Sequence, residues 1–156
     1  MAGLALFGAG ICEAAVVRPA PDFGWVGIKG KSTLRSMRGQ PVVLVVAKNA
    51  KSRAFKKQVK RLRGIYSQFA SRGVVFAVAF TEESAPQVPS DIPFAIVNDG
   101  PGTAAAYGVE KDFAITVIGK DGNVDYTTYK VLPSYRVRDV IQNSFAVQKV
   151  ARTNVP

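Results

Sequence analysis

The stretch that decides the fold is VVLVVAKNAKSRAFKKQVKRL, residues 42–62. Its first six residues are all apolar, and a continuous apolar run of this length predicts a strand that is buried on both faces of a sheet. Residues 52–70 then carry apolar side chains at intervals of three and four, which predicts an amphipathic helix. These side chains are Phe55, Val59, Leu62, Tyr66 and Phe69. Because VVFAVAF, residues 74–80, predicts a second buried strand, we expect a β-α-β unit.

The segments on either side of this unit predict further elements. Residues 25–41 indicate a hairpin-like stretch, residues 92–99 a short strand and residues 100–109 a brief helix. Two strands, at about 113–118 and 124–130, flank Asp121-Gly122, which is typical of a tight hairpin turn. A last helix over residues 133–145, capped by Ser134, completes a single domain that we place at residues 18–147, with a tail at 148–156.

The N-terminal residues 1–17, MAGLALFGAGICEAAVV, resemble the apolar core and small-residue end of a secretory signal. Cleavage after Ala14 would leave small residues at the key positions, so we expect a periplasmic or secreted protein. No Lys or Arg precedes the apolar run, and the protein is cytoplasmic if the segment is not a signal. Lipidation at Cys12, membrane association through this segment and retention as a packed arm stay open. The segment is too short to cross a bilayer as a helix.

Composition excludes several classes of site. The 156 residues contain no His and a single Cys, Cys12, so this sequence cannot build a His or Cys zinc site, a Ser-His-Asp triad or a dithiol pair. No cluster of Asp and Glu indicates a carboxylate metal site, and we expect no cofactor. The net charge of +10 instead predicts an encounter with polyanions, meaning an acidic protein, an anionic surface or nucleic acid.

Four phrases of the sequence resemble a known fold family. They are APDFGW at 20–25, LRSMRGQPVVLVV at 34–46, NDGPGTAAAYGV at 98–109 and FAITVIGKDGNV at 113–124. Together with the order of elements they resemble the thioredoxin-like fold of peroxiredoxin-like and thiol-disulfide oxidoreductase-like proteins, over about residues 20–145. The resemblance implies an α/β, three-layer sandwich around a mixed central sheet of four or five strands.

The active site of that superfamily is not retained. The resemblance places its reactive cysteines at the start of the first helix, where the dipole lowers a thiol pKa, and its cis-proline just before the third central strand. Here the cysteine positions fall on Lys51, Ser52, Arg53 and Ala54, and the proline position falls on Asp112 or Phe113. We therefore expect a protein without enzymatic activity. An oxidoreductase relative that works with a partner's cysteines is the alternative.

A run of cations takes the place of the redox site. Like charges at three- and four-residue spacing repel one another, and cations near a helix start oppose its dipole, so the pattern suggests an anion that offsets both penalties. We expect a docking face for an acidic protein or an anionic surface, and a solvated basic helix is the other interpretation. No nucleic-acid module is recognisable, so nucleic acid is the weaker candidate. The candidate anion-binding residues are Lys48, Lys51, Ser52, Arg53, Lys56, Lys57, Lys60 and Arg61. The oligomeric state is not predicted.

Overall fold

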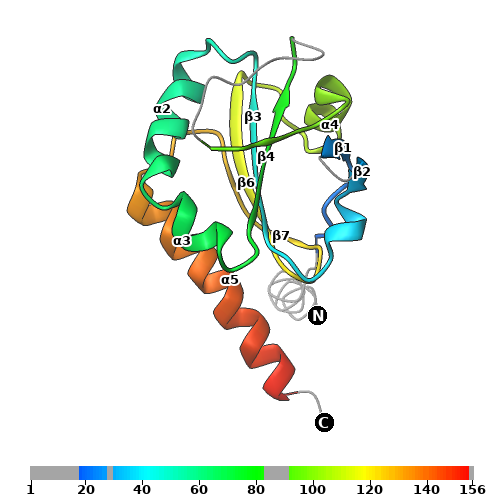
Figure 1. Ribbon diagram of the computed structural model, residues 1–156, viewed down its shortest axis with the longest axis vertical. Helices are drawn as coiled ribbons and strands as arrows, with labels where there is room; N and C mark the ends of the chain where they lie inside the picture. The colour runs from blue at the N-terminus through cyan, green and yellow to red at the C-terminus, as the bar shows by residue number, and fades with distance from the viewer. Residues whose placement is uncertain (1–17, 28–29, 83–91, 155–156) are drawn as a thin grey trace, which may run out of the picture.

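A five-stranded mixed sheet forms the centre of the molecule, with strand order β5-β4-β3-β6-β7 (Figure 1). The structure, a computed structural model, describes residues 18–27, 30–82 and 92–154. The strands are β3 (Val42–Ala47), β4 (Val75–Phe80), β5 (Ala95–Ile96), β6 (Phe113–Ile118) and β7 (Val124–Thr128). Strand β3 runs parallel to β4 and antiparallel to β6, so the sheet is mixed, as the sequence predicts.

Strand β3 is fully buried because both faces of the sheet are covered. Val43 and Val45 point into one apolar cluster, while Leu44 and Val46 point into a second cluster on the opposite face. Each of the six residues of β3 has essentially no exposed surface. The continuous apolar run of the sequence is thus explained by its central position between two apolar layers.

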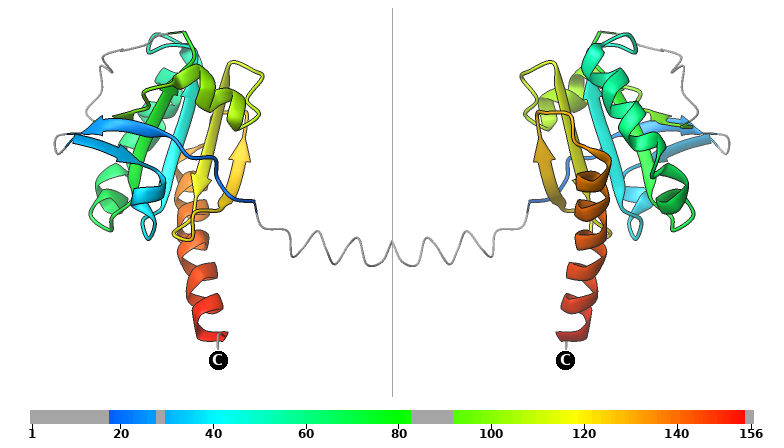
Figure 2. Two further views of the ribbon diagram at one scale, coloured as in Figure 1. Left: turned by 90° about the vertical axis from the view of Figure 1, so that its right-hand side faces the viewer. Right: turned by 90° about the vertical axis from the view of Figure 1, so that its left-hand side faces the viewer.

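The two layers differ in content. Helices α2 (Arg53–Arg63), α3 (Tyr66–Ala70) and α5 (Ser134–Asn154) cover one face (Figure 2). The hairpin β1 (Gly24–Gly27) and β2 (Gly30–Thr33), the short 3-10 helix η1 (Arg35–Met37) and helix α4 (Gly100–Ala106) cover the other. This arrangement confirms the predicted α/β three-layer sandwich of the thioredoxin-like kind.

The single helix expected over residues 52–70 is divided in two. Helix α2 ends at Arg63, and α3 begins at Tyr66. Gly64 has a low helix propensity and therefore weakens the helix at this point. Ile65, which is not part of the predicted apolar stripe, is buried, with only 5% of its surface exposed. Burial of Ile65 therefore breaks the regular three-and-four spacing.

The last helix is longer than the sequence predicts. Helix α5 continues through Asn154, past residue 145, where the sequence predicts that the helix ends. No Gly or Pro interrupts residues 134–154, and five of the seven residues 146–152 are good helix formers. The end of α5 runs past the sheet (Figures 1 and 2). The Ser134 hydroxyl, expected as its cap, donates a hydrogen bond to the carbonyl of Arg61 at 2.6 Å.

The predictions for residues 1–17, including those for Ala14 and Cys12, lie outside the described residues. Within the ranges that are described, no helix combines the length and apolarity that crossing a membrane requires.

Candidate functional site

The corner between β3 and α2 is built by local hydrogen bonds. The Ser52 side chain accepts a hydrogen bond from the Phe55 amide at 3.3 Å, so Ser52 is the N-cap of α2. The side chain of Asn49 accepts from the Lys51 amide at 2.9 Å, which shapes the preceding turn. Ser and Asn are residue types that favour such caps and turns, because their short polar side chains accept hydrogen bonds from nearby backbone amides.

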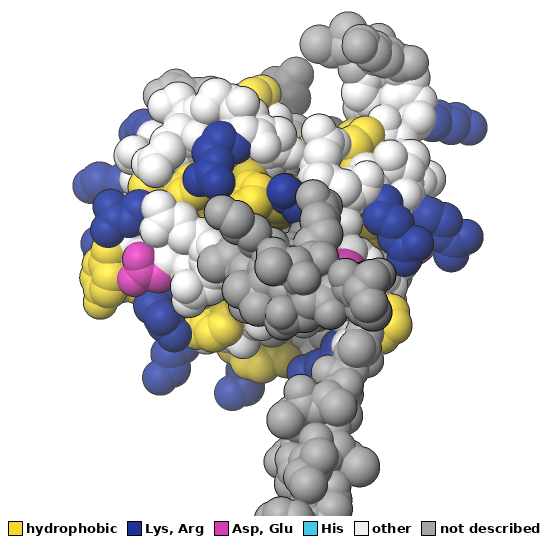
Figure 3. Space-filling view, turned by 90° about the horizontal axis from the view of Figure 1, so that it is seen from below, with side chains coloured by type: hydrophobic (Ala, Val, Ile, Leu, Met, Phe, Trp, Pro, Cys, Tyr) yellow, Lys and Arg dark blue, Asp and Glu magenta, His cyan; other side chains and the backbone are white. Residues whose placement is uncertain are grey.

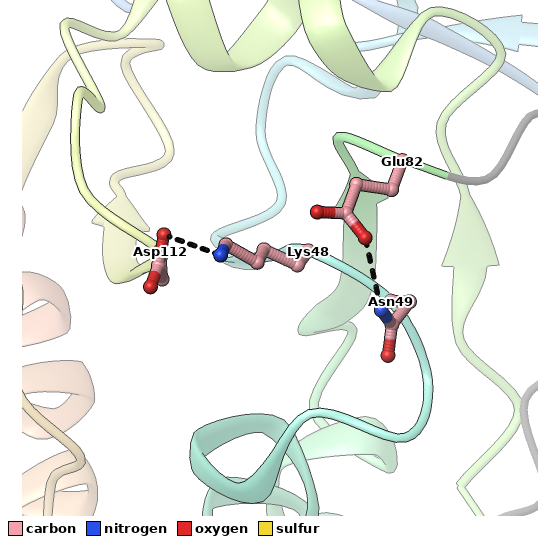
Figure 4. A network of polar contacts seen from close by, with 4 residues as sticks. All are labelled: Lys48, Asn49, Glu82 and Asp112. Carbon is pink, nitrogen blue, oxygen red and sulfur yellow. Dashed lines mark hydrogen bonds and ion pairs between the residues drawn. The ribbon is translucent and has the colours of Figure 1, made fainter.

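Two polar contacts join this corner to the residues that follow β4 and precede β6 (Figure 4). The ammonium of Lys48 lies 3.2 Å from a carboxylate oxygen of Asp112, and the amide of Asn49 donates to Glu82 at 3.1 Å. Lys48 and Glu82 follow the carboxyl ends of the parallel strands β3 and β4, and Asp112 precedes β6. In open α/β sheets, ligands bind at the edge formed by the carboxyl ends of the parallel strands. In this protein the Lys48–Asp112 ion pair lies at that edge.

The structure brings the two halves of the degenerate redox site together. Residues 51–54 form the turn and the first residues of α2, and the Lys48–Asp112 contact places the position before β6 beside them. Phe113 begins β6 and is buried, and Ala54 packs on the core. Asp112, one of the two positions that the resemblance compares with the cis-proline, thus contacts this corner through Lys48. None of residues 51–54, 112 and 113 is a cysteine or a histidine, because the single cysteine is Cys12 and the sequence has no histidine.

Helix α2 has an apolar face and a basic face on opposite sides. Phe55 packs edge-on against Phe80, with ring centroids 5.1 Å apart, and Val59 and Leu62 are buried beside it. At 100° per residue, the side chains of Arg53, Lys56, Lys57 and Lys60 leave the helix on the side opposite this face. Packing of the apolar face on the sheet thus fixes the direction of the basic side chains.

Five cations line one shallow hollow of about 380 Å³ on this surface: Lys51, Arg53, Lys56, Lys57 and Lys60. We call these five residues the basic hollow. None of them lies within ion-pair distance of a carboxylate in the described part of the chain. An anion that enters would therefore meet several uncompensated positive charges and the positive end of the α2 dipole.

Three of the predicted residues are not part of the basic hollow. Lys48 is directed to Asp112, the Ser52 hydroxyl is engaged as the N-cap, and Arg61 is exposed further along α2. The backbone amides of Lys51 and Ser52, near the start of α2, already donate to the Asn49 side chain and carbonyl. Side chains, more than backbone amides, would therefore bind an anion here.

Sequence reasoning missed Gln58, which anchors α2. Its side chain is fully buried, donates to the carbonyl of Leu132 at 3.1 Å and accepts from the amide of Leu132 at 2.8 Å. The pair ties α2 to the segment before α5. A polar residue within the apolar stripe, between Phe55 and Val59, was the only available signal, and it does not name the partner.

The positive charge of the protein extends beyond α2. In the view from below, basic side chains surround the molecule and few acidic ones are visible (Figure 3).

Two groups outside the basic hollow have pKa values displaced from their ordinary range. Burial raises the pKa of Tyr107, with a further rise from Asp22. Desolvation by burial raises the pKa of Asp125, the hydrogen bond from Ser144 lowers it, and Asp121 adds a smaller rise.

Comparisons with known proteins agree with the architecture. No curated protein sequence matches the chain significantly. Among solved structures, a protein described as thiol:disulfide interchange protein DsbE from Chlorobium tepidum superposes with a TM-score of 0.68 at 19% identity, covering 82% of this chain and 96% of that one. Thioredoxin peroxidase I from Plasmodium yoelii gives 0.67 at 17% identity, covering 90% and 94%. Peroxidoxin BcpB from Mycobacterium tuberculosis gives 0.66 at 18% identity, covering 84% and 96%.

These likenesses establish a shared fold, and a family model adds the relationship in sequence. The model of the AhpC/TSA family matches residues 16–127, which include β3, the degenerate corner and the β6–β7 hairpin. A two-cysteine redox site is absent from this sequence, which has one cysteine. The chain therefore belongs to the AhpC/TSA family, as a thioredoxin-fold member in which an ion pair joins Lys48 to Asp112 at the corner between β3 and α2.

Proposed function

We propose that the protein is a redox-inactive thioredoxin-fold module that binds an acidic protein partner through the basic hollow of α2. The observation that carries the proposal is the convergence of five cations, with no carboxylate of the described residues within ion-pair distance, next to a corner whose own residues include no cysteine. Long-range attraction would raise the rate of encounter with an acidic surface. Because the five side chains are exposed, binding should be strongly weakened by salt.

The test measures binding of a fluorescent hexaglutamate peptide by anisotropy at increasing ionic strength. We expect the affinity to fall steadily as salt is added, since exposed charges are screened beyond about 10 Å at 0.1 M salt. The Lys56/Lys57/Lys60→Glu variant should lose binding.

The matched control is Arg18/Lys31/Lys111→Glu, which lowers the net charge equally on exposed residues elsewhere in the chain. It should keep most of the affinity. An affinity that does not change with salt, or that falls equally in both variants, would contradict the proposal, because it would mean that no particular face binds.

The second candidate is a thiol-disulfide or peroxide oxidoreductase that uses the cysteines of a partner. Membership of the AhpC/TSA family favours it. The corner would then position a partner's sulfur near Lys48 without supplying one. This candidate predicts that the chain accelerates the reduction of a disulfide or a peroxide only when a protein that supplies cysteines is present in the assay.

The setting that we propose is the cell envelope or the extracellular space, as part of a larger assembly. The support is the signal-like composition of residues 1–17. The N-terminal sequence of the protein from its natural source should begin directly after Ala14. A natural protein that begins at Met1 would contradict export by this signal.

A further inference from the structure

Two exposed tyrosines flank the connection that joins β7 to α5. Among the described residues, the large hydrophobic side chains that are clearly exposed are Val26, Tyr129 and Tyr135. Tyr129 follows β7 and is 48% exposed, whereas Tyr135 is in the first turn of α5 and is 59% exposed. Exposed aromatic side chains are enriched at the energetic centres of protein interfaces.

This connection is held firmly against α2. The Ser134 hydroxyl donates to the Arg61 carbonyl at 2.6 Å, and the Gln58 side chain makes two hydrogen bonds to the backbone of Leu132. Along the axis of α2 both contacts lie near the level of Lys57 and Lys60, Gln58 from the buried face and Arg61 through its backbone carbonyl. Tyr135, which follows Ser134, is therefore fixed next to the helix that carries the basic hollow.

The basic hollow presents positive charge but is lined by no aromatic or aliphatic residue. All five lining residues are Lys or Arg. Exposed ion pairs contribute little free energy each and select poorly between anionic partners. A partner that also buries an apolar side chain would gain both affinity and selectivity.

We propose that the basic hollow and Tyr135 form one composite site for an acidic protein segment that carries an aromatic or large aliphatic residue beside its acids. Carboxylates would lie on Lys56, Lys57 and Lys60, and the apolar residue would pack on Tyr135. This inference rests on the proposed function and names the chemistry of its partner.

The dimensions set the length of the acidic part. From Arg53 to Lys60 the helix rises about 10 Å. An extended chain advances about 3.3 Å per residue, so about three acidic residues cover the hollow. Among the described residues the clearly exposed aromatic side chains are Tyr129 and Tyr135, too few to form a row for stacking bases, which favours a protein segment over single-stranded nucleic acid.

The probes are hexaglutamate and two longer peptides that carry one tryptophan, at the N- or the C-terminal end, after a Gly-Gly spacer. We expect tryptophan at one end to raise the affinity about fivefold. Tyr135→Ser should remove that increase and leave the affinity for hexaglutamate unchanged. Val26→Ser, which removes an exposed apolar side chain from β1 on the other face of the sheet, is the control and should change neither affinity. Thermal unfolding of each variant checks that the fold is intact.

The outcomes separate the two proposals. If tryptophan gives no increase, or the increase survives Tyr135→Ser, the composite site is wrong, while loss of hexaglutamate binding in Lys56/Lys57/Lys60→Glu still supports the proposed function. If hexaglutamate does not bind at all, both proposals fall. If oligothymidine binds more tightly than either tryptophan peptide and depends on Tyr135, the partner is nucleic acid and the inference is overturned.

Discussion

At the scale of single residues, Gln58 makes two buried hydrogen bonds to the backbone of Leu132. Replacing Gln58 with leucine keeps an apolar helix face but leaves the amide and carbonyl of Leu132 without their partners. A buried polar group without a hydrogen bond costs about 1–3 kcal/mol, so Gln58→Leu should lower the free energy of unfolding by about 2 kcal/mol or more. Urea denaturation measures the change.

The control for this prediction is Gln68→Ala, on the exposed surface of α3. Its free energy of unfolding should stay within about 0.5 kcal/mol of the parent. An equal loss of unfolding free energy in both variants would contradict the prediction, because the hydrogen bonds to Leu132 would then stabilise the fold no more than a surface side chain does.

Asp125 provides a prediction of pH dependence. Its folded-state pKa is raised, chiefly by burial, so the folded protein holds this proton more tightly than the unfolded chain does. The associated stability is present below the ordinary aspartate pKa of about 4 and is lost as pH rises through the folded pKa. Asp125→Asn should therefore flatten this part of the curve of unfolding free energy against pH, and it should be at least as stable as the parent at neutral pH.

Denaturation at intervals from pH 4 to pH 7 tests this prediction, with Asp139→Asn as a carboxylate control on α5. A parent protein whose stability rises across that window because of Asp125 would contradict the sign of the shift.

At the scale of elements, two glycines near α2 and α3 should respond in opposite ways to alanine. Gly64 has helical backbone angles, φ −71° and ψ −17°, and a Cβ there would meet no atom within 4 Å. Gly64→Ala should raise the free energy of unfolding by about 0.4–1 kcal/mol, because alanine restricts the unfolded chain.

Gly73, after α3, is the matched contrast. Its φ of +88° is left-handed, where an L side chain is strained, so Gly73→Ala should lower the free energy of unfolding by about 1–2 kcal/mol. Thermal denaturation of both variants in parallel is the measurement. Changes in unfolding free energy of the same sign would show that the backbone angles at Gly64 and Gly73 do not determine the effect of alanine.

At the scale of the whole molecule, the prediction concerns catalysis. The full chain and its Cys12→Ser variant should reduce neither insulin disulfides nor hydrogen peroxide faster than buffer with dithiothreitol, because the corner between β3 and α2 contains no thiol. Activity lost in Cys12→Ser would identify Cys12 as a reactive thiol. Activity that survives the substitution would overturn the redox-inactive proposal altogether.

Much of the architecture could be predicted because it is encoded locally. The apolar run of β3 and the spacing of Phe55, Val59 and Leu62 are patterns within a few residues, and each follows from which faces are buried. The positive φ of Gly122 in the β6–β7 turn was predictable for the same reason. The division between α2 and α3 was not, since it depends on the burial of Ile65 against other elements.

The sequence by itself determined the fold class, through the buried strand and its amphipathic helix, and it determined the loss of dithiol chemistry, through the absence of a second cysteine and of histidine. Only the tertiary structure decided which of the predicted cations lies apart from the others. It turned Lys48 toward Asp112, whereas Lys51 to Lys60 line one hollow that belongs to α2 and its preceding turn. It also placed Leu132 on Gln58, and with it Tyr135 beside α2. The physical reason is that hydrophobic periodicity acts between near neighbours in the chain, whereas these contacts join segments that meet only when the sheet and its layers assemble.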